Sequence, residues 1–421
     1  MQALISRSKT EGKVTAPSSK SYTIRGLMCG VLADGQSRLL DPLGSDDTDA
    51  AAGVLRKIGV KINQNKHEWI LNSTGFKPPV GELFCGDSAA TLRFMMGICA
   101  LVPGECRLTA GPSLSARPVK PLQDALRQLG INCLSKDGFP PVTIKGGNLK
   151  GGVVTLPGDI SSQFISALLM VAPLAAQGID IKLSTPLESR PYVMMTLDTM
   201  QWFGITVAFN EALDVFSILP QKYKPTRYII ECDWSSASYM LALGALTGDV
   251  TVTGLPLETM QGDRMILNFL KDMGADITKR GNSIIVQKSN LKAITADLTD
   301  CTDLLPTMAV LAAAAKGVTV LTGIARARIK ESDRVAAISE NLERMGIKTI
   351  TESNRIVITG GMPVGAIIDS KNDHRIAMAF SLLGTMVGNT VITKADCVGK
   401  TYPEFWNALQ NLGGKVVFNE Q

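Results

Sequence analysis

Positively charged residues stand at the starts of strongly apolar segments in this chain of 421 residues. Lys20 and Arg25 open the first such segment, Arg93 lies early in the second, and Arg375 opens the last. A cation in the first turns of an apolar helix opposes the helix dipole and enters a region with little water. A bound anion offsets that cost, because free backbone N–H groups at helix N-termini already attract phosphate. The pattern therefore predicts a site for small anions.

Ordinary helix capping is the competing interpretation of the polar residues at these starts. Ser, Thr, Asp and Asn are the usual N-cap residues. Capping is a sufficient explanation for Ser235, Ser236 and Thr302, which stand at the starts of two further apolar segments. It does not explain the cations.

Further cations lie in short loops, in the segments ARP (116–118), ESRPY (188–192) and KESDR (330–334). Taken alone, a charged run such as 330–334 is typical of a solvated helix start. Lys400, in VGKTYPEFW, resembles an ordinary surface lysine when it is considered by itself. No one of these segments therefore identifies a site alone.

The composition is that of a soluble globular protein, with 45% hydrophobic and 19% charged residues. This excludes collagen-like, disordered and disulfide-scaffold classes. The net charge of +5 is spread along the chain without a dense basic run. We therefore expect neither a nucleic acid nor a membrane as partner. With two histidines and no Cys/His cluster, we also expect no zinc site.

The cysteines and the apolar segments predict a cytoplasmic protein. None of the eight cysteines forms a C-x-x-C pair, which favours buried free thiols in a reducing compartment. The longest apolar stretches are too short to span a membrane. The first residues, MQALISRSKTEGKV, lack the apolar core of a signal peptide.

A single pattern recurs six times along the chain and predicts how these residues are positioned. Each copy contains an apolar helix and then an amphipathic helix that ends at a glycine before a short strand. The glycines recur about every 70 residues, at Gly59, Gly130, Gly204, Gly274, Gly346 and Gly413. A helix that is apolar on all sides must be buried on all sides.

We therefore predict an α/β fold of two similar domains, each with three units, with the helices inside and the sheets outside. One domain is expected to span residues 13–225. The other is expected to combine residues 1–12 with residues 226–421.

Several motifs together resemble the EPSP synthase (3-phosphoshikimate 1-carboxyvinyltransferase) family. The most specific are S-K-S-x-x-x-R at Ser19–Arg25, K-E-S-D-R at Lys330–Arg334 and N-D-H-R at Asn372–Arg375. G-D-I-S-S-Q-F (158–164) and A-R-P (116–118) add support, and the resemblance covers essentially the whole chain. It implies two domains of three βαβαββ units, an inside-out barrel arrangement, with the active site in the cleft between them.

The resemblance also implies the reaction. The enolpyruvyl group of phosphoenolpyruvate is transferred to the 5-hydroxyl of shikimate-3-phosphate by addition and elimination, which releases phosphate. This is a step of the shikimate pathway towards chorismate and the aromatic amino acids. The resemblance implies no cofactor and no metal. Both substrates carry a phosphate and a carboxylate, which accounts for the cations.

The family's functional residues carry over to matching positions of this sequence. Those implied to bind shikimate-3-phosphate are Lys20, Ser21, Arg25, Ser161, Ser162, Gln163, Ser189, Tyr192, Asp303 and Lys330. Those implied to bind phosphoenolpyruvate are Lys20, Ala89, Arg117, Gln163, Arg334, Arg375 and Lys400. Asp303 is the implied proton acceptor for the 5-hydroxyl, and Glu331, with Lys20, the implied proton donor to the phosphoenolpyruvate methylene carbon.

Three positions depart from the family pattern. Ala89 replaces a glycine whose backbone lies against phosphoenolpyruvate, where an added methyl group leaves less room. We therefore expect the alanine-bearing, glyphosate-insensitive type, with glyphosate as a weak inhibitor. Arg326 and Asp87 each stand where asparagine is common, and Arg326 is left out of the site for that reason. The protein is expected to be a monomer.

Three alternatives remain open. A sister family transfers enolpyruvyl to UDP-N-acetylglucosamine, but it has Lys-Asn in place of Lys20-Ser21 and a reactive cysteine that the segment GPSLSARP lacks. An RNA-end-processing enzyme built from similar units would need a nucleotide site and a catalytic histidine. A catalytically inactive repeat scaffold is the third, because a fold alone does not establish a function.

Overall fold

Each of the six apolar segments forms a helix that is buried along nearly its whole length. In this computed structural model, which describes residues 1–419, the apolar helices are α1 (Lys20–Leu32), α3 (Ala89–Cys99), α6 (Ser162–Val171), α8 (Trp234–Thr247), α10 (Leu305–Ala314) and α12 (His374–Val387). The absence of a polar face leaves these helices no surface to offer to water. None of the helices within residues 1–419 has the length and apolar character needed to cross a membrane.

The amphipathic helices end at the six glycines, as the repeat predicts. They are α2 (Asp46–Lys57), α5 (Lys120–Gln128), α7 (Arg190–Trp202), α9 (Ile266–Asp272), α11 (Arg334–Arg344) and α13 (Phe405–Asn411). All six glycines have φ between +80° and +98°, a conformation that costs other residues energy. The remaining helical turns are α4 (Pro112–Ser115), η1 (Ala172–Leu174), η2 (Gly262–Met265), η3 (Thr302–Leu304), η4 (Ala325–Ile329) and η5 (Ala395–Lys400).

The chain divides into two compact units. The N-terminal unit is Ser18–Glu231, and the C-terminal unit combines Met1–Pro17 with the chain from Cys232 onwards. The predicted boundaries, after residues 12 and 225, each lie a few residues earlier. They would cut through β2 (Thr10–Thr15) and would separate β14 (Arg227–Ile229) from β3 (Gly35–Leu40), with which it pairs. Strand pairing therefore decides where the two units end.

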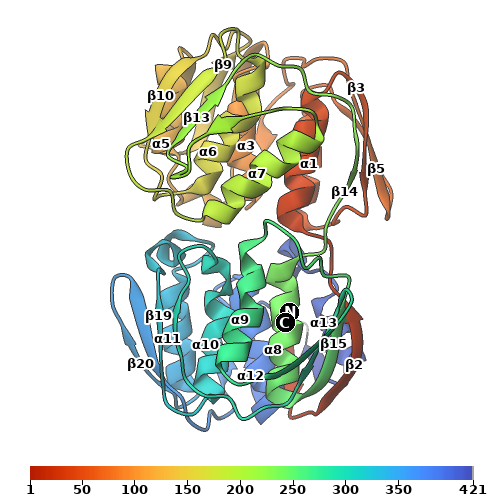
Figure 1. Cartoon of the computed structure of the whole chain (residues 1–421), viewed down its shortest axis with the longest axis vertical. Coiled ribbons are helices and arrows are strands. Elements are labelled where there is room, and N and C mark those ends of the chain that lie inside the picture. Colours follow the sequence, from red (N-terminus) through yellow and green to blue (C-terminus); the bar gives the residue numbers. More distant parts are fainter. Residues whose placement is uncertain (420–421) are drawn as a thin grey trace. The chain divides into compact units, whose positions relative to one another are not determined.

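Three four-stranded sheets surround the apolar helices of the N-terminal unit, with the orders β14-β3-β5-β4, β6-β7-β9-β8 and β10-β11-β13-β12 (Figure 1). Their other strands are β4 (Lys61–Gln64), β5 (Glu68–Ser73), β6 (Leu83–Phe84), β7 (Gly104–Thr109), β8 (Asn132–Lys136), β9 (Phe139–Gly146), β10 (Gly152–Leu156), β11 (Ile179–Leu183), β12 (Ala208–Phe209) and β13 (Val215–Ile218). The inward face of each sheet packs on α1, α3 and α6, which together form one hydrophobic core.

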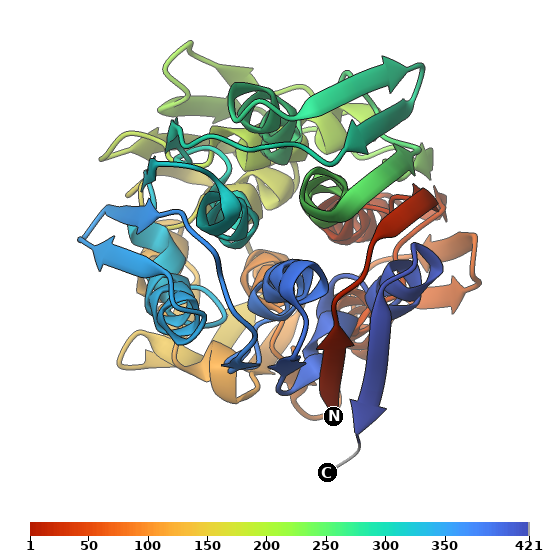
Figure 2. The ribbon, with the colours of Figure 1, turned by 90° about the horizontal axis from the view of Figure 1, so that it is seen from below.

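The C-terminal unit repeats this plan around α8, α10 and α12, with the sheet orders β16-β17-β15-β2, β18-β19-β21-β20 and β22-β23-β1-β24. Its strands besides β2 are β1 (Gln2–Ser6), β15 (Gly248–Thr253), β16 (Asp276–Arg280), β17 (Ser283–Gln287), β18 (Thr295–Asp297), β19 (Val318–Thr322), β20 (Lys348–Thr351), β21 (Arg355–Thr359), β22 (Ile367–Ile368), β23 (Thr390–Ile392) and β24 (Lys415–Asn419). Seen end-on in Figure 2, the apolar helices α8, α10 and α12 of this unit lie inward and its strands outward.

All six sheets share one topology. In each sheet one edge strand pairs in parallel with its neighbour, and the other two pairings are antiparallel, as in β6, β7, β9 and β8. In four sheets the parallel pair flanks an apolar helix as a βαβ unit, for example β18-α10-β19. Because a parallel pair needs a crossover, this topology places the start of each apolar helix directly after a strand.

Candidate functional site

Arg25 is held inside α1 by neutral acceptors. Its guanidinium donates to Thr196 Oγ1 at 2.8 Å, to the carbonyl of Ser21 at 3.0 Å and to the carbonyl of Tyr192 at 2.9 Å. It also lies over the rings of Phe94 and Tyr192. Burial lowers the pKa of Arg25 to about 10, which still leaves the guanidinium charged at neutral pH. The residue therefore brings the starts of α1 and α7 together and carries a positive charge there.

Lys20 is the first residue of α1 and forms an ion pair with the buried carboxylate of Asp47, with Nζ 2.9 Å from Oδ2. Asp47 lies in the first turn of α2, where a carboxylate is favoured by the helix dipole. The ammonium group is thus fixed by a neighbouring helix of the same unit. Its side chain keeps 17% of its surface exposed and so remains accessible to a ligand.

Arg93 joins two predicted parts of the site, although it is absent from the site residues that the family resemblance implies. Its NH1 group donates to Ser161 Oγ at 3.1 Å and to Gln163 Oε1 at 2.8 Å, and its NH2 group donates to the carbonyl of Pro118. The guanidinium lies 4.8 Å from the ring centre of Phe164. One buried arginine therefore holds the start of α6 and the loop that carries Arg117. The only signal for it in the sequence is a cation inside an apolar helix.

The start of α6 has the geometry of an anion site. Ser161 is the N-cap and its hydroxyl accepts from the N–H of Gln163 at 3.4 Å, while Ser162 is the first helical residue. At α7 the cap position is occupied by Ser189, which is buried and has φ of 53°. A non-glycine residue in this left-handed conformation is uncommon and often marks a functional position.

Ala89 opens α3 directly after its N-cap, Ser88, and is 6% exposed. Its neighbour Asp87 accepts a hydrogen bond from the N–H of Leu114 at 3.0 Å. A Cβ atom added at Gly111 would lie 2.6 Å from Oδ1 of Asp87, so the loop approaches this carboxylate too closely for a side chain. Asp87 therefore fixes the loop that leads to Arg117.

In the C-terminal unit Asp303 is surrounded by cations. Its Oδ1 accepts from Arg334 at 2.8 Å and its Oδ2 from Arg375 at 3.0 Å, and Lys330 Nζ lies 3.5 Å from Oδ1. Burial opposes ionisation, but Arg375, Lys330 and Arg334 together outweigh it and hold the pKa of Asp303 well below its usual range. The carboxylate is therefore charged at every physiological pH.

Arg334 connects three carboxylates and is almost fully buried. Besides Asp303, it donates through Nε to Asp373 at 2.8 Å and through NH2 to Glu331 at 2.6 Å. Asp373 is the N-cap of α12, the helix that Arg375 opens. The motifs K-E-S-D-R and N-D-H-R thus meet at Asp373, which also accepts from the hydroxyl of Ser332 at 3.0 Å. They form a single cluster although 39 positions separate Arg334 from Asp373.

Two lysines complete this cluster. Lys400 Nζ lies 3.9 Å from Glu331 Oε1, so it is a buried member of the cluster rather than a surface lysine. Burial lowers the pKa of Lys330 to about 8, although Asp303 opposes that shift. Arg326, which was left out of the site, donates to the carbonyl of Thr299 at 2.7 Å and to Thr302 Oγ1 at 3.3 Å. It supports the turn that carries Asp303.

One predicted role for the serines is wrong. The N-cap of α8 is Asp233, whereas Ser235 and Ser236 lie inside the helix. The hydroxyl of Ser236 donates to Asp233 at 2.7 Å, and that of Ser235 donates to Asp263. Thr302 likewise lies within η3 and donates to the carbonyl of Leu298 at 3.1 Å. The side chains of Ser235, Ser236 and Thr302 therefore bond to other side chains or to a turn carbonyl and do not cap the helices.

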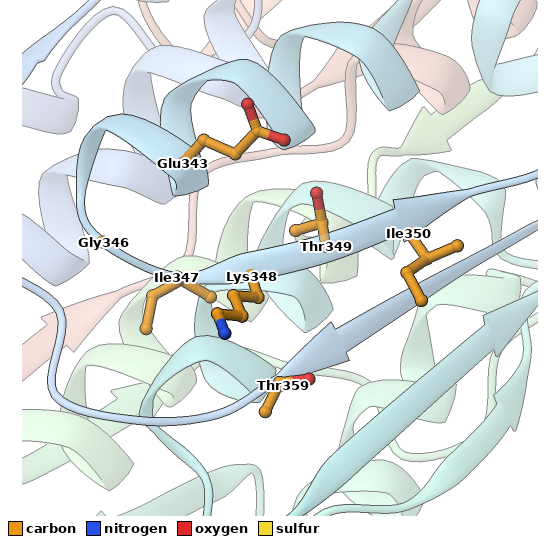
Figure 3. Close-up of a pocket in the computed structure, with 7 residues that line it drawn as sticks. All are labelled: Glu343, Gly346, Ile347, Lys348, Thr349, Ile350 and Thr359. Carbon is orange, nitrogen blue, oxygen red and sulfur yellow. The ribbon is translucent and has the colours of Figure 1, made fainter.

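Two surface grooves are lined by none of the predicted site residues. One, of about 470 Å³, lies between the end of α11 and strand β20, and the residues that line it include none of the candidate site residues (Figure 3). The other, of about 500 Å³, includes Pro118 and Ile160, which neighbour the predicted Arg117 and Ser161. The polar clusters, rather than these grooves, therefore define the candidate site.

Comparison with known proteins decides the family. The family model described as EPSP synthase (3-phosphoshikimate 1-carboxyvinyltransferase) matches residues 5–409. The chain belongs to the EPSP synthase family. A 3-phosphoshikimate 1-carboxyvinyltransferase of Dehalococcoides mccartyi strain 195 is 48% identical over 99% of both chains. One from Methanospirillum hungatei is 41% identical over 96% of both chains.

Solved structures agree with this membership. EPSP synthase from Acinetobacter baumannii superimposes with a TM-score of 0.83 at 28% identity, covering 99% of this chain and all of that one. The enolpyruvyl transferase NikO from Streptomyces tendae has the same fold, with a TM-score of 0.81 at 16% identity over 99% of this chain and 98% of that one. The predicted fold and the predicted 3-phosphoshikimate 1-carboxyvinyltransferase activity in the shikimate pathway are thereby confirmed.

Proposed function

We propose that the clusters described above bind the two substrates of the EPSP synthase reaction and carry its proton transfers. In the N-terminal unit, Ser161, Ser162 and Gln163 receive the phosphate of shikimate-3-phosphate at the start of α6. Further contacts to this substrate come from Lys20, Ser21, Arg25, Ser189, Tyr192, Asp303 and Lys330. The hydroxyls of Ser161 and Ser162, at the positive end of the α6 dipole, support this assignment.

Phosphoenolpyruvate is assigned to the cations that surround the acids. Arg375 and Arg334 offer guanidinium groups, which suit a carboxylate or phosphate in two-point contact. Both already contact Asp303 or Glu331. The bound substrate therefore shares these two arginines with the acidic side chains. Further contacts come from Lys20, Ala89, Arg117, Gln163 and Lys400.

The reaction proceeds by addition and elimination. Asp303 accepts the proton of the 5-hydroxyl as that oxygen bonds to C2 of phosphoenolpyruvate, while Glu331, with Lys20, delivers a proton to C3. In the second step C3 loses a proton and the C2–phosphate oxygen bond breaks, which restores the methylene group and releases phosphate. The single observation that carries the proposal is that Asp303 and Glu331 meet on one guanidinium, that of Arg334.

Phosphate release from phosphoenolpyruvate tests the substrate assignment. We expect release with shikimate-3-phosphate and none with UDP-N-acetylglucosamine. Asp303→Asn should reduce the turnover by about 10²–10⁴-fold, the usual contribution of a general base. Asp276→Asn, a change of an exposed aspartate in the same unit, is the matched control and should leave turnover unchanged. Full activity of Asp303→Asn would contradict the proposed role.

We also propose that the protein is relatively insensitive to glyphosate because of Ala89. The position is helical, so the backbone does not require glycine and the methyl group is free to narrow the site. Ala89→Gly should lower the glyphosate concentration that gives half-inhibition by at least tenfold, at a cost of about 1 kcal/mol in helix stability. Inhibition assays on both proteins check this, and equal inhibition would show that Ala89 does not set the tolerance.

We also propose that the enzyme is a monomer and lies in the cytoplasm. Within residues 1–419 none of the eight cysteines is in a disulfide and six of them are buried, which suits a reducing compartment. Light scattering on the purified chain checks the monomeric state.

A further inference from the structure

Asp263 is a buried acid that the proposed mechanism does not use. It lies in the turn η2 and is 3% exposed. Its Oδ2 accepts a hydrogen bond from the hydroxyl of Ser235, in the first turn of α8. Its Oδ1 is buried and receives no hydrogen bond from any residue of the described part of the chain, 1–419. A carboxylate oxygen without a donor is strongly disfavoured in its charged form.

The turn that carries Asp263 is fastened to the start of α8 by other bonds. The side chain of Gln261 accepts from the N–H of Trp234 at 3.0 Å and donates to the carbonyl of Cys232 at 2.8 Å. The indole of Trp234 donates to the carbonyl of Pro256 at 2.9 Å. The position of the Asp263 carboxyl is therefore fixed by the fold.

Asp263 lies within electrostatic reach of the proposed site. The charged or titratable groups that act on it are Asp303 from η3, Arg375 from α12 and Asp233 at the start of α8, and the thiol of Cys301 also feels its charge. Burial, Asp303 and Asp233 disfavour its ionisation, while Arg375 and Ser235 favour it. The result is a pKa raised to about 7.

We propose that Asp263 is a positioning residue for phosphoenolpyruvate: its buried carboxyl, held by Ser235 within electrostatic reach of Arg375 and Asp303, controls how much positive charge Arg375 presents to the substrate. This inference rests on the proposed function, in which Arg375 binds phosphoenolpyruvate. When Asp263 is neutral, only Asp303 competes with the substrate for the positive charge of Arg375. An ionised Asp263 adds a competing negative charge and weakens substrate binding.

The kinetic test compares the parent protein with Asp263→Asn between pH 6 and pH 8. Asparagine mimics the neutral carboxyl in shape, so the KM for phosphoenolpyruvate should differ by less than twofold at pH 6. At pH 8 the KM of the parent should be about tenfold higher than that of Asp263→Asn. A tenfold difference corresponds to an interaction of about one pKa unit between the ionised Asp263 carboxylate and the bound phosphoenolpyruvate. The titration of the substrates is common to both proteins and cancels in the comparison. Parallel KM profiles, or a loss of equal size at every pH, would overturn the proposal.

A second variant tests the same claim without removing the acid. In Ser235→Ala the ionised carboxylate loses its donor, so the pH at which the KM rises should move upward. An unchanged midpoint in Ser235→Ala would count against the proposal. Asp276→Asn serves as the control for loss of an exposed aspartate and should follow the parent at every pH.

A stability measurement separates this inference from the proposed function. The folded state favours the neutral carboxyl, so the stability it contributes is full below the unfolded pKa of about 3.9 and is lost as the pH rises through about 7. Denaturant unfolding at pH 5 to 8 should therefore show the parent losing stability relative to Asp263→Asn. If the parent protein releases no phosphate, the proposed function is refuted. The stability measurement can still be interpreted in that case, because it does not depend on activity. A stability difference that does not change with pH would refute the titration of Asp263 itself.

Discussion

At the scale of single residues, the site depends on charges that are shared. Asp303 is contacted by Arg334, Arg375 and Lys330, and Arg334 in turn contacts Glu331 and Asp373. Removing one partner from such a buried cluster leaves a charge without compensation, which typically costs about 3–5 kcal/mol. The effect of any one substitution therefore depends on its neighbours, and single variants do not measure separate contributions.

Lys330 gives a prediction at this scale. Its pKa is lowered to about 8, chiefly by burial, so its charge is present below that pH and is lost above it. If it binds shikimate-3-phosphate as a cation, the affinity should fall by about tenfold per pH unit above pH 8. Titration calorimetry from pH 7 to pH 9.5 measures this. Lys330→Arg retains the charge over this range, so its affinity for shikimate-3-phosphate should not change with pH. An equal fall in affinity in both proteins would mean that another group titrates.

At the scale of elements, the starts of the apolar helices are held by side chains from other segments. Arg93, in α3, bonds to Ser161, Gln163 and Pro118, which lie 25 to 70 residues further along the chain. Arg25 fastens α1 to α7 in the same way. These two arginines therefore hold segments that contain the proposed substrate-binding residues.

Arg93→Lys tests that view of the elements. Lysine keeps the charge but cannot make several planar contacts at once, so the start of α6 and the Arg117 loop should lose their common support. We expect the KM for shikimate-3-phosphate to rise by about tenfold or more, equivalent to about 1.4 kcal/mol. Arg127→Lys, a change at an exposed arginine of α5 that donates to the carbonyl of Cys133, is the control and should leave the KM unchanged. A normal KM in Arg93→Lys would mean that Ser161 and Gln163 hold their positions without it.

Local patterns predict the elements well because their causes are local. A helix with no polar face must be buried, and a glycine after the last turn permits the positive φ that ends the helix at Gly59 or Gly274. The contact of Ser235 with Asp263 has no local signal, because 28 residues separate the two. The same holds for Arg93, whose role is visible only once α3 and α6 pack together. The capping interpretation of Ser235 failed because Asp233, two residues earlier, is the N-cap of α8.

At the scale of the whole molecule, the six sheets have one topology, although the chain leaves one unit and returns to it. Residues 1–17 complete sheets of the C-terminal unit, through β1 with β24 and β2 with β15. The sequence repeat predicts this architecture because each unit carries the same order of elements. The positions of the boundaries follow from strand pairing, which the repeat does not specify to the residue.

The proton transfer to C3 of phosphoenolpyruvate is the central step of the proposed reaction. The most direct measurement runs the reaction in deuterium oxide and analyses the enolpyruvyl group of the product by mass spectrometry and NMR. Addition and elimination predicts deuterium at the methylene carbon, and it predicts a much slower incorporation with Glu331→Gln. A product formed at the normal rate without deuterium would contradict the proposed mechanism, because C3 would then never have been protonated.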